Sequence, residues 1–521
     1  MNRFSKILSC FVAAAIMFGL FSFGHNNASA ATEYHYLSGT RDPFYQPFSS
    51  TSIWNMPIGS GAEYKAANLP STRIDANGTE RLRQVSIDTE YILKTGTYDE
   101  VLTLYSYNST WDDSRWPSPD LLGKSRGTLY WPGGYTVAKT TGNACSAVLQ
   151  PDRRTIIQLQ PTCRADSEST YITGYQRSGV DIYGSGEYGS HFGSGLSTIG
   201  GSIRVGELTS GEPIRHALKL NINAKEFLYY CEDVPGYKWP ADRADSYASK
   251  TDAEGNKRYG GTDPQLVMGS LLALPKDITA ADLGITSEVG KKLFFTLQNY
   301  GCYITDDSNW NAYCICAEVG VREEVIQKYG EPYDMKGYEN AYAKEFVSMV
   351  SSLAIVVNNS ADSIGGGGTP MQPLLPEIYP VQSVEFGADD VFINVGDSVK
   401  LNTSVYPLNA SYQKVSYKSN NEGVATVLSD GTVTAKKVGT ATITVTTEEG
   451  GHTDICTITV IPAAINTAGS LTSNHLNTAT QCVLGSYNLT DSEKTTIDMD
   501  LSGTVDSLDA LIIKQKLLGI I

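Results

Sequence analysis

The residues whose types and spacing most clearly support chemistry lie near the C-terminus, between Asp498 and Asp509. Oxygen-bearing side chains recur around a central glycine, and one backbone carbonyl adds a further oxygen; the candidate ligands are Asp498, Asp500, Ser502, Thr504 (through its carbonyl), Asp506 and Asp509. A hard cation such as calcium needs this spacing, because alternate side chains converge on one point and the glycine permits a sharp turn. The spacing therefore predicts a calcium loop, with a solvated acidic turn as the alternative.

A helical pattern follows this loop, carried by Leu508, Leu511, Ile512, Gln515 and Leu518. The loop is therefore expected to enter a helix and to form half of an EF-hand-like unit. With an aspartate at the twelfth loop position, residues 498–519 resemble a dockerin repeat, and residues 487–494 resemble ruminococcal dockerins in particular. The resemblance implies a partner, the cohesin module of a scaffoldin in a cellulosome- or amylosome-type complex. Dockerins usually carry two repeats, and residues 475–487 fit a helix without the aspartate ladder, so a second calcium site stays open.

Acids, histidines and arginines form a second chemically capable set in residues 181–216, among β-favouring apolar residues. A glycosidase needs one carboxylic acid to protonate the leaving oxygen and one carboxylate as base or nucleophile. Glu207, paired with Asp307 or with Asp181, supplies these two groups. For each residue, a buried salt bridge or a capped turn is the structural alternative.

A polysaccharide lyase could use other members of the same stretch. It needs a base beside a uronic carboxylate and a cation or amide that neutralises that carboxylate. His216 or His191 would be the base and Arg204 the neutralising group, although a histidine within an apolar strand is as readily a hydrogen-bonded core residue. Trp239 and Asp263, further along the chain, are additional candidates for substrate binding.

Three short motifs in this region carry a second resemblance. They are Arg204 and Glu207 followed by residues 214–218 (IRHAL), residues 239–241 (WPA), and residues 298–301 (QNYG) followed by Asp307. The pattern resembles a family of exported proteins of actinobacteria and myxobacteria with no assigned activity. The resemblance implies a shared fold and specifies no reaction.

The N-terminus has the pattern of a secretory signal. Arg3 and Lys6 precede an apolar run over residues 7–23, and small residues at 28–30 offer a cleavage site. No later stretch reaches the length of a membrane span. The mature protein is therefore expected outside the cell, secreted or in a cell-surface complex.

Composition and spacing divide the rest of the chain. Four glycines at 365–368 and the prolines that follow suggest a flexible piece running into a stiff one. The predicted boundaries are 1–30 for the signal peptide, 31–359 for a large catalytic domain, 360–380 for a linker, 381–462 for a small β-domain and 463–521 for the dockerin-like domain.

The small β-domain shows period-2 alternation broken by turns, which predicts a β-sandwich of seven or eight strands. Residues 419–427 (SNNEGVATV), 429–435 (SDGTVTA) and 438–445 (VGTATITV) resemble bacterial immunoglobulin-like domains of group 2. The resemblance implies a spacer in preference to a ligand-binding module.

In the large domain, strand patterns such as those at 101–105, 155–159 and 217–222 recur, and helical patterns are few, at 288–300, 322–329 and 342–352. This mix predicts an antiparallel, β-rich α+β domain with peripheral helices, within a multidomain and mainly β protein. The cysteines leave disulfide pairing open, and Cys145 with Cys163 would close a plausible loop.

Charge narrows the class of ligand. The formal net charge is −16, and loss of Arg3 and Lys6 with the signal peptide lowers it to −18. An acidic chain disfavours nucleic acid, because phosphate binding needs a basic surface. The 31 tyrosines suit flat ligands such as sugar rings.

Dockerins most often attach polysaccharide-degrading enzymes to scaffolds, so the resemblance favours an extracellular glycoside hydrolase in polysaccharide catabolism. The alternatives are a non-catalytic component that binds polysaccharide or cell wall, and a polysaccharide lyase. No sequence feature identifies the polysaccharide.

Overall fold

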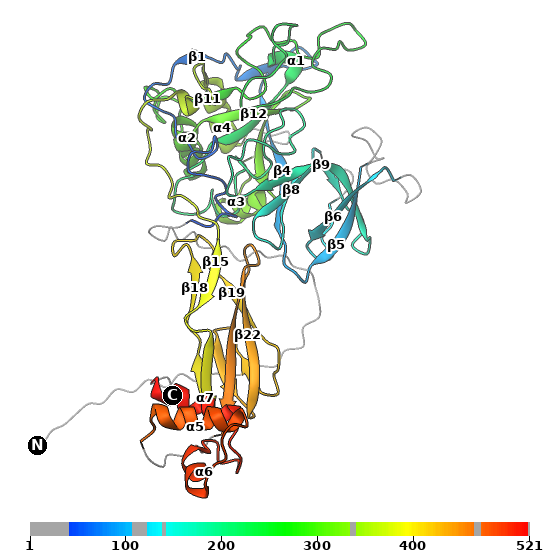
Figure 1. Ribbon diagram of the computed structural model, residues 1–521. Coiled ribbons are helices and arrows are strands. Elements are labelled where there is room, and N and C mark those ends of the chain that lie inside the picture. Colours follow the sequence, from blue (N-terminus) through cyan, green and yellow to red (C-terminus); the bar gives the residue numbers. More distant parts are fainter. Residues whose placement is uncertain (1–40, 107–121, 138–141, 334–339, 463–469, 519–521) are drawn as a thin grey trace, which may run out of the picture.

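The computed structural model describes residues 41–106, 122–137, 142–333, 340–462 and 470–518. The predicted signal peptide lies outside these residues. Figure 1 shows three parts in chain order: a large domain coloured blue to green, a β-sandwich in yellow and orange, and a group of helices in red. Within the described residues, no helix is long and apolar enough to cross a membrane.

A twelve-stranded sheet organises the large domain. Its strands, in spatial order, are β1 (Tyr64–Ala66), β14 (Ala354–Val356), β11 (Leu271–Ala273), β12 (Cys302–Asp307), β10 (Leu218–Ile222), β13 (Ala312–Glu318), β4 (Gln84–Lys94), β7 (Ser146–Leu149), β8 (Thr155–Cys163), β9 (Tyr171–Asp181), β5 (Glu100–Tyr105) and β6 (Ser125–Trp131). A separate hairpin pairs β2 (Thr72–Ile74) with β3 (Glu80–Leu82). The protein is mainly β, as predicted.

The direction of strand pairing differs from the antiparallel expectation. Four pairings in the large sheet are parallel: β10 with β12, β4 with β13, β4 with β7, and β5 with β9. Parallel neighbours need long crossover connections. The segment from residue 223 to 301 is one such connection, and it carries α1 (Ala224–Phe227), β11 and α2 (Glu288–Asn299).

Strand β4 joins the two halves of this sheet. Its first half, Gln84 to Glu90, pairs with β13, and its last residues, Tyr91 to Lys94, pair with β7. The domain has two hydrophobic cores: the larger contains Trp54 and extends to Ala147 and Ile156 in β7 and β8, and the smaller contains Trp131. Side chains in the middle of β4 therefore lie where the two halves meet.

The predicted helices of the large domain are present within a residue or two of their expected bounds. They are α2 (Glu288–Asn299), α3 (Val321–Tyr329) and α4 (Ala341–Ser351). Helix α2 begins where the Ser287 side chain accepts a hydrogen bond from the Gly290 N–H, and it buries Val289, Leu293 and Leu297.

The glycine run at 365–368 is not a flexible linker. It packs against the large domain: the Gly59 N–H donates to the Gly365 carbonyl and the Gly61 N–H donates to the Gly367 carbonyl, both at 2.9 Å. A short 3₁₀ helix spans Ile364–Gly366. A Cβ atom on Gly59 would overlap the Gly367 carbonyl, so glycine here permits close backbone approach.

The small β-domain is a sandwich of nine strands, one more than the upper limit of the prediction. They are β15 (Ser383–Phe386), β16 (Asp390–Asn394), β17 (Ser398–Lys400), β18 (Thr403–Tyr406), β19 (Val415–Ser419), β20 (Ala425–Val427), β21 (Thr432–Ala435), β22 (Gly439–Thr447) and β23 (Thr453–Ile461). Alternate residues of β22 and β23, such as Ile443, Val445 and Ile458, fill its core.

Three helices form the C-terminal part: α5 (Ser473–Val483), α6 (Asp491–Ile497) and α7 (Ser507–Leu517). The helix expected after the acidic loop is thus present as α7, and α5 packs beside it. Their apolar side chains share a core with Phe392 and Ile461 of the β-domain.

Cys145 and Cys163 are both buried, and the disulfide that their spacing allows is absent from the described residues.

Candidate functional site

A cavity of about 840 Å³ opens in the large domain, within the size range of small-molecule sites. Strands β4, β8, β10, β12 and β13 contribute to its wall, together with the loops that contain Asn143, Phe192 and Asp245. It lies beside the middle of β4, where the two halves of the sheet meet.

Four carboxylates line this cavity, although they are far apart in the sequence. Asp88 stands in β4, Asp306 and Asp307 end β12, and Asp245 lies in the connection between α1 and β11. They face one space because β4 and β12 belong to the same sheet, separated only by β10 and β13.

One amide side chain bridges two of these acids. The Asn143 Nδ2 atom donates to Asp88 Oδ2 at 2.8 Å and lies 3.3 Å from Asp306 Oδ2. Because both distances start at the same nitrogen, the two oxygens are at most about 6 Å apart. Paired carboxyl groups in retaining glycosidases are separated by about 5 to 5.5 Å, and in inverting enzymes by about 6.5 to 9.5 Å.

Asp88 has a raised pKa. Burial raises the pKa of Asp88, the neighbouring Glu90 and Asp306 charges raise it further, and the opposing effects of His191 and Asn143 leave it at about 6. Its Oδ2 atom also accepts a hydrogen bond from Asn221 at 2.9 Å.

Asp306 lies in a donor-rich setting. Its Oδ2 atom accepts from Gln160 Nε2 at 3.1 Å and lies 3.5 Å from His191 Nδ1, besides its contact with Asn143. Its Oδ1 atom accepts the Asp307 N–H at 2.9 Å. Hydrogen bonds of this kind stabilise the charged form of a carboxylate.

The two remaining acids are tied to the surrounding loops. Asp307 accepts N–H groups of Ala224 and Asn309 on one oxygen and the Tyr247 hydroxyl on the other. Asp245 accepts the Tyr259 hydroxyl at 2.9 Å. Burial, followed by the Asp306 charge, raises the pKa of Asp245 to about 8, so this side chain is largely protonated at neutral pH.

Aromatic side chains complete the wall of the cavity. Phe192 and Tyr247 are half-buried there, and Trp310 keeps 39% of its surface exposed. An exposed indole beside paired carboxylates offers a flat apolar face to a ring-shaped ligand.

Behind Asp306 lies a buried row of charged side chains. His191 Nε2 is 2.6 Å from Glu90 Oε1, and Lys219 Nζ is 2.7 Å from that same oxygen. Glu90, His191 and Lys219 are fully buried.

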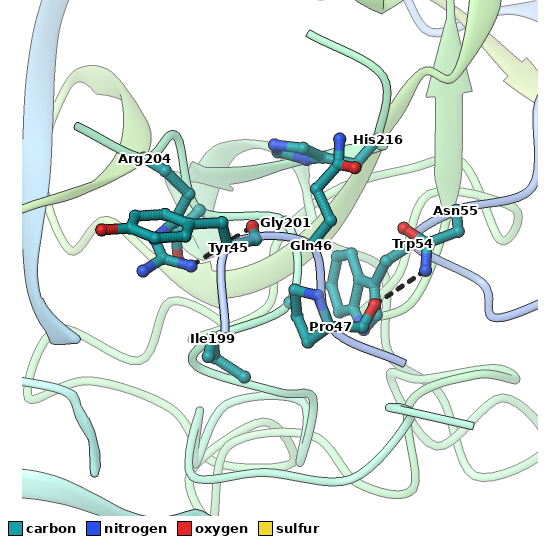
Figure 2. A pocket seen from close by; sticks show the side chains of 11 residues that line it. Tyr45, Gln46, Pro47, Trp54, Asn55, Ile199, Gly201, Arg204 and His216 are labelled. Carbon is teal, nitrogen blue, oxygen red and sulfur yellow. Dashed lines mark hydrogen bonds between the residues drawn. The ribbon is translucent and has the colours of Figure 1, made fainter. Parts of the chain in front are cut away.

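Of the residues predicted from sequence, Asp307 lines the cavity. His191 does not line it but contacts Asp306, which does. Glu207 and His216 contact each other elsewhere, with 3.1 Å between His216 Nε2 and Glu207 Oε2. Figure 2 shows His216 and Arg204 in the wall of a second, narrow pocket of about 10 Å³, which has room for roughly one water molecule.

Arg204 is held within that second site by several contacts. It donates to Glu318 and to the Phe44 carbonyl, and its guanidinium lies over the Phe44 and Tyr45 rings. Glu207 accepts the Arg204 N–H as well as contacting His216. The structure thus gives these residues a structural network and separates Glu207 from Asp307.

The other three candidates lie outside the cavity as well. Asp181 forms an ion pair with Arg154 at 2.7 Å, and Asp263 forms one with Lys65 at 2.7 Å. Trp239 packs half-buried against the main core.

Sequence reasoning missed Asp88, Asp306, Asp245 and Asn143. Two signals were present. Asp88 and Glu90 occupy alternate positions of β4 and so share one face of the strand, and Asp306 adjoins the predicted Asp307.

The acidic C-terminal loop joins α6 to α7 and brings its carboxylates together. Oxygen atoms of Asp498, Asp500 and Asp509 lie within 4.8 Å of one another. Asp509 is fully buried, and burial raises its pKa, so the site gains from a bound cation that favours the charged form. Asp506 caps α7 by accepting the Leu508 N–H.

The two remaining predicted ligands also lie within this turn. The Ser502 hydroxyl donates to the Thr504 carbonyl at 2.9 Å. Gly503 adopts a left-handed φ of 84°, as the sharp turn requires. An all-oxygen donor set of this kind fits a calcium ion.

Comparison with known proteins identifies the β-domain. Residues 380–458 match the family described as Bacterial Ig-like domain (group 2). This match confirms the predicted Ig-like domain.

Relatives of the chain match only in part. A kappa-carrageenase of Pseudoalteromonas carrageenovora is 46% identical over 103 residues, which cover 20% of this chain and 24% of that protein. An alpha-L-arabinofuranosidase of Bifidobacterium longum subsp. longum is 50% identical over 66 residues, 13% of this chain and 6% of the relative. An A type blood N-acetyl-alpha-D-galactosamine deacetylase of Flavonifractor plautii is 38% identical over 80 residues, 15% and 10% of the two chains. The chain therefore spans a quarter or less of these relatives.

Proposed function

We propose that this protein is a carbohydrate-active enzyme and that its large domain is a glycoside hydrolase. The observation that carries the proposal is the pair of carboxylates, Asp88 and Asp306, that Asn143 bridges inside an open cavity. The names of three of the partial relatives refer to carbohydrates and support the same class.

In this proposal Asp88 is the general acid and Asp306 is the nucleophile or base. A general acid must carry a proton at the working pH, and the raised pKa of Asp88, about 6, suits that role. Asp306 is held by donors that favour its carboxylate form. The separation of at most about 6 Å leaves little room for a water molecule between Asp306 and the anomeric carbon, so we expect retention of anomeric configuration.

The steps follow from these two roles. Asp306 attacks the anomeric carbon while Asp88 protonates the departing glycosidic oxygen, which leaves a glycosyl ester on Asp306. Asp88, now a carboxylate, then takes a proton from water. That water displaces Asp306 from the sugar and restores both carboxyl groups to their starting states.

Charge in the cavity argues against a lyase. A lyase must neutralise a uronic carboxylate with a cation or an amide, and neighbouring carboxylates would repel such a substrate. Of the described residues that line the cavity, Arg258 is the single cation, against four aspartates. Arg204, the neutralising group predicted from sequence, is engaged by Glu318 in the second pocket.

The C-terminal part would attach this enzyme to an extracellular complex. We propose that the loop from Asp498 to Asp509 binds calcium and that α5 to α7 form a dockerin-like module that binds a cohesin. The arrangement of α6, loop and α7 and the convergence of three carboxylates support the calcium site. A secreted location is part of the same proposal.

The hydrolase proposal is tested on the full chain with a panel of polysaccharides. Release of reducing ends and absorbance of unsaturated products are followed together. We expect reducing ends without unsaturated products, and a loss of at least about 1,000-fold in kcat/KM for Asp88→Asn and Asp306→Asn. Asp181→Asn, at the surface ion pair, is the matched control and should retain activity.

Two results would contradict this proposal. Unsaturated products would indicate a lyase. Retention on insoluble polysaccharide without turnover on any substrate would indicate a binding protein.

The calcium proposal has its own measurement, isothermal titration of the calcium-depleted protein with calcium. We expect one site in the wild type and at least tenfold weaker binding in Asp500→Asn, because one ligand charge is lost. Equal affinity in both proteins would exclude this loop as the site.

A further inference from the structure

Four ionisable side chains form a row that begins in the cavity wall and ends in the interior. Asp306 is followed by His191, then by Glu90, then by Lys219. The last three are fully buried, and Asp306 is 6% exposed. A buried row of this kind is costly unless each charge meets an opposite one.

We infer that His191 is a positioning residue that holds Asp306 as an oriented carboxylate, and that Glu90 and Lys219 fix the imidazole in place for this task. The inference rests on the proposed hydrolase, in which Asp306 must remain ionised while Asp88 carries the proton.

The contacts of the ring indicate a charged imidazole. Its Nε2 atom faces Glu90 Oε1 at 2.6 Å and its Nδ1 atom faces Asp306 Oδ2 at 3.5 Å. A neutral ring has one nitrogen without hydrogen, which would point a lone pair at one of these carboxylates. Only the imidazolium can donate to both.

The other groups around the ring fit this state. Burial and the Lys219 charge lower the pKa of His191, but the hydrogen bonds of Asp306 and Glu90 and the charge of Glu90 raise it above its ordinary value. Cys145 Sγ lies 3.9 Å from Nδ1, and burial raises the pKa of this thiol, so it is neutral. Asp88 stands on the same strand as Glu90, and the His191 charge lowers its pKa.

Lys219 anchors the inner end of the row. Its ammonium donates to both oxygens of Glu90 and to the carbonyls of Ser197 and Thr198. With Lys219 and the imidazolium balancing Glu90 and Asp306, the row is neutral as a whole. Glu90, Cys145 and His191 also have metal-like spacing, but the Lys219 ammonium, 3.2 Å from His191 Nε2, already supplies the cation at this point.

His191 contacts Asp306 directly, whereas the side chains that donate to Asp88 are the amides of Asn143 and Asn221. The imidazolium can therefore orient Asp306 by a hydrogen bond, and it acts on Asp88 only through its charge, which lowers the pKa of Asp88.

The first test is the pH profile of kcat/KM in His191→Gln. Loss of a positive charge beside the carboxylates should move the acidic limb upward by about 1 to 3 pH units while KM changes less than kcat. His216→Gln is the matched control, because His216 is another buried histidine paired with a carboxylate, and it should leave the limb in place. An unmoved limb in His191→Gln would overturn the inference.

The second test needs no activity and therefore separates this inference from the proposed function. The protein is labelled with ¹⁵N-histidine, and the ring nitrogens of His191 are followed from pH 5 to pH 9. We expect both nitrogens to be protonated at pH 7.5 in the wild type, and Asp306→Asn to lower the pKa of His191 measurably. A neutral His191 at pH 7.5, or a pKa unchanged by Asp306→Asn, would overturn the inference even in an active enzyme.

Discussion

Replacing the proposed catalytic acid with asparagine should stabilise the large domain at neutral pH. Asp88 is buried enough for its pKa to rise from 3.8 to about 6. A carboxyl group with a raised pKa binds its proton more tightly in the folded state, so folding is penalised wherever the group is ionised. Asparagine removes the charge and keeps an oxygen that can accept from Asn143 and Asn221.

The size of the stabilisation by Asp88→Asn follows from the pKa shift of Asp88. About two pKa units at about 1.4 kcal/mol each give about 3 kcal/mol, and partial exposure to solvent reduces this to about 1 to 3 kcal/mol. Below the unfolded pKa near 3.8, both states of the wild type are protonated and the gain vanishes. It should grow between pH 4 and pH 6 and be complete above pH 6.

Urea unfolding followed by tryptophan fluorescence measures this gain. All six tryptophans lie between residues 54 and 310, so the signal reports the large domain. Asp88→Asn should raise the free energy of unfolding at pH 7.5 and match the wild type at pH 4, and Asp263→Asn provides a surface control. A destabilised Asp88→Asn at pH 7.5, or a gain that is equal at every pH, would refute the electrostatic account of Asp88.

Three further predictions follow from particular contacts. Trp310→Ala should raise KM about 3- to 10-fold with a smaller effect on kcat, because it removes an exposed stacking face worth about 0.5 to 1.5 kcal/mol; steady-state kinetics on the active polysaccharide measure this. Tyr183→Phe leaves the buried Glu449 carboxylate without its 2.6 Å hydroxyl donor, so limited proteolysis between the large and Ig-like domains should quicken, whereas an unchanged rate would dismiss the contact as unimportant. Lys219→Met should cost about 3 to 5 kcal/mol in urea unfolding, and the double variant with Glu90→Gln should recover most of it; an additive loss would show that the two charges are not coupled.

Local features of the fold were predictable and the pairing of strands was not. Helix α2 shows its start, apolar face and end within one short stretch, so periodicity alone finds it. The sequence contains no comparable signal for the direction of β4 relative to β13 and β7, because buried strands have similar sequences in parallel and antiparallel sheets. The glycines at 365–368 also mislead, since glycine serves both flexible linkers and tight backbone packing.

The two candidate sites differ in the same way. The acidic loop from Asp498 to Asp509 is one short stretch of sequence, so the spacing of its residues is enough to predict that its carboxylates converge. The cavity draws Asp88 and Asp306 from strands more than 200 residues apart, and only the strand order places them in one space. Glu207 and His216 were predicted as site residues because they are close in the sequence. The two side chains do contact each other, but the pocket beside them is too small for a sugar.

The Ig-like domain contacts both of its neighbours, which bears on how the cavity is presented. Towards the large domain, Glu449 is buried between the Tyr183 hydroxyl and the Val381 N–H, and the Gly450 N–H donates to the Asp152 carbonyl. Towards the C-terminus, Ile461 is buried among the side chains of α5 to α7. Because the Ig-like domain is held at both ends, it fixes the direction as well as the distance between the large domain and the C-terminal helices. If the C-terminal helices bind a scaffold as proposed, the cavity is then held at a set orientation to that scaffold and does not swing on a tether (Figure 1).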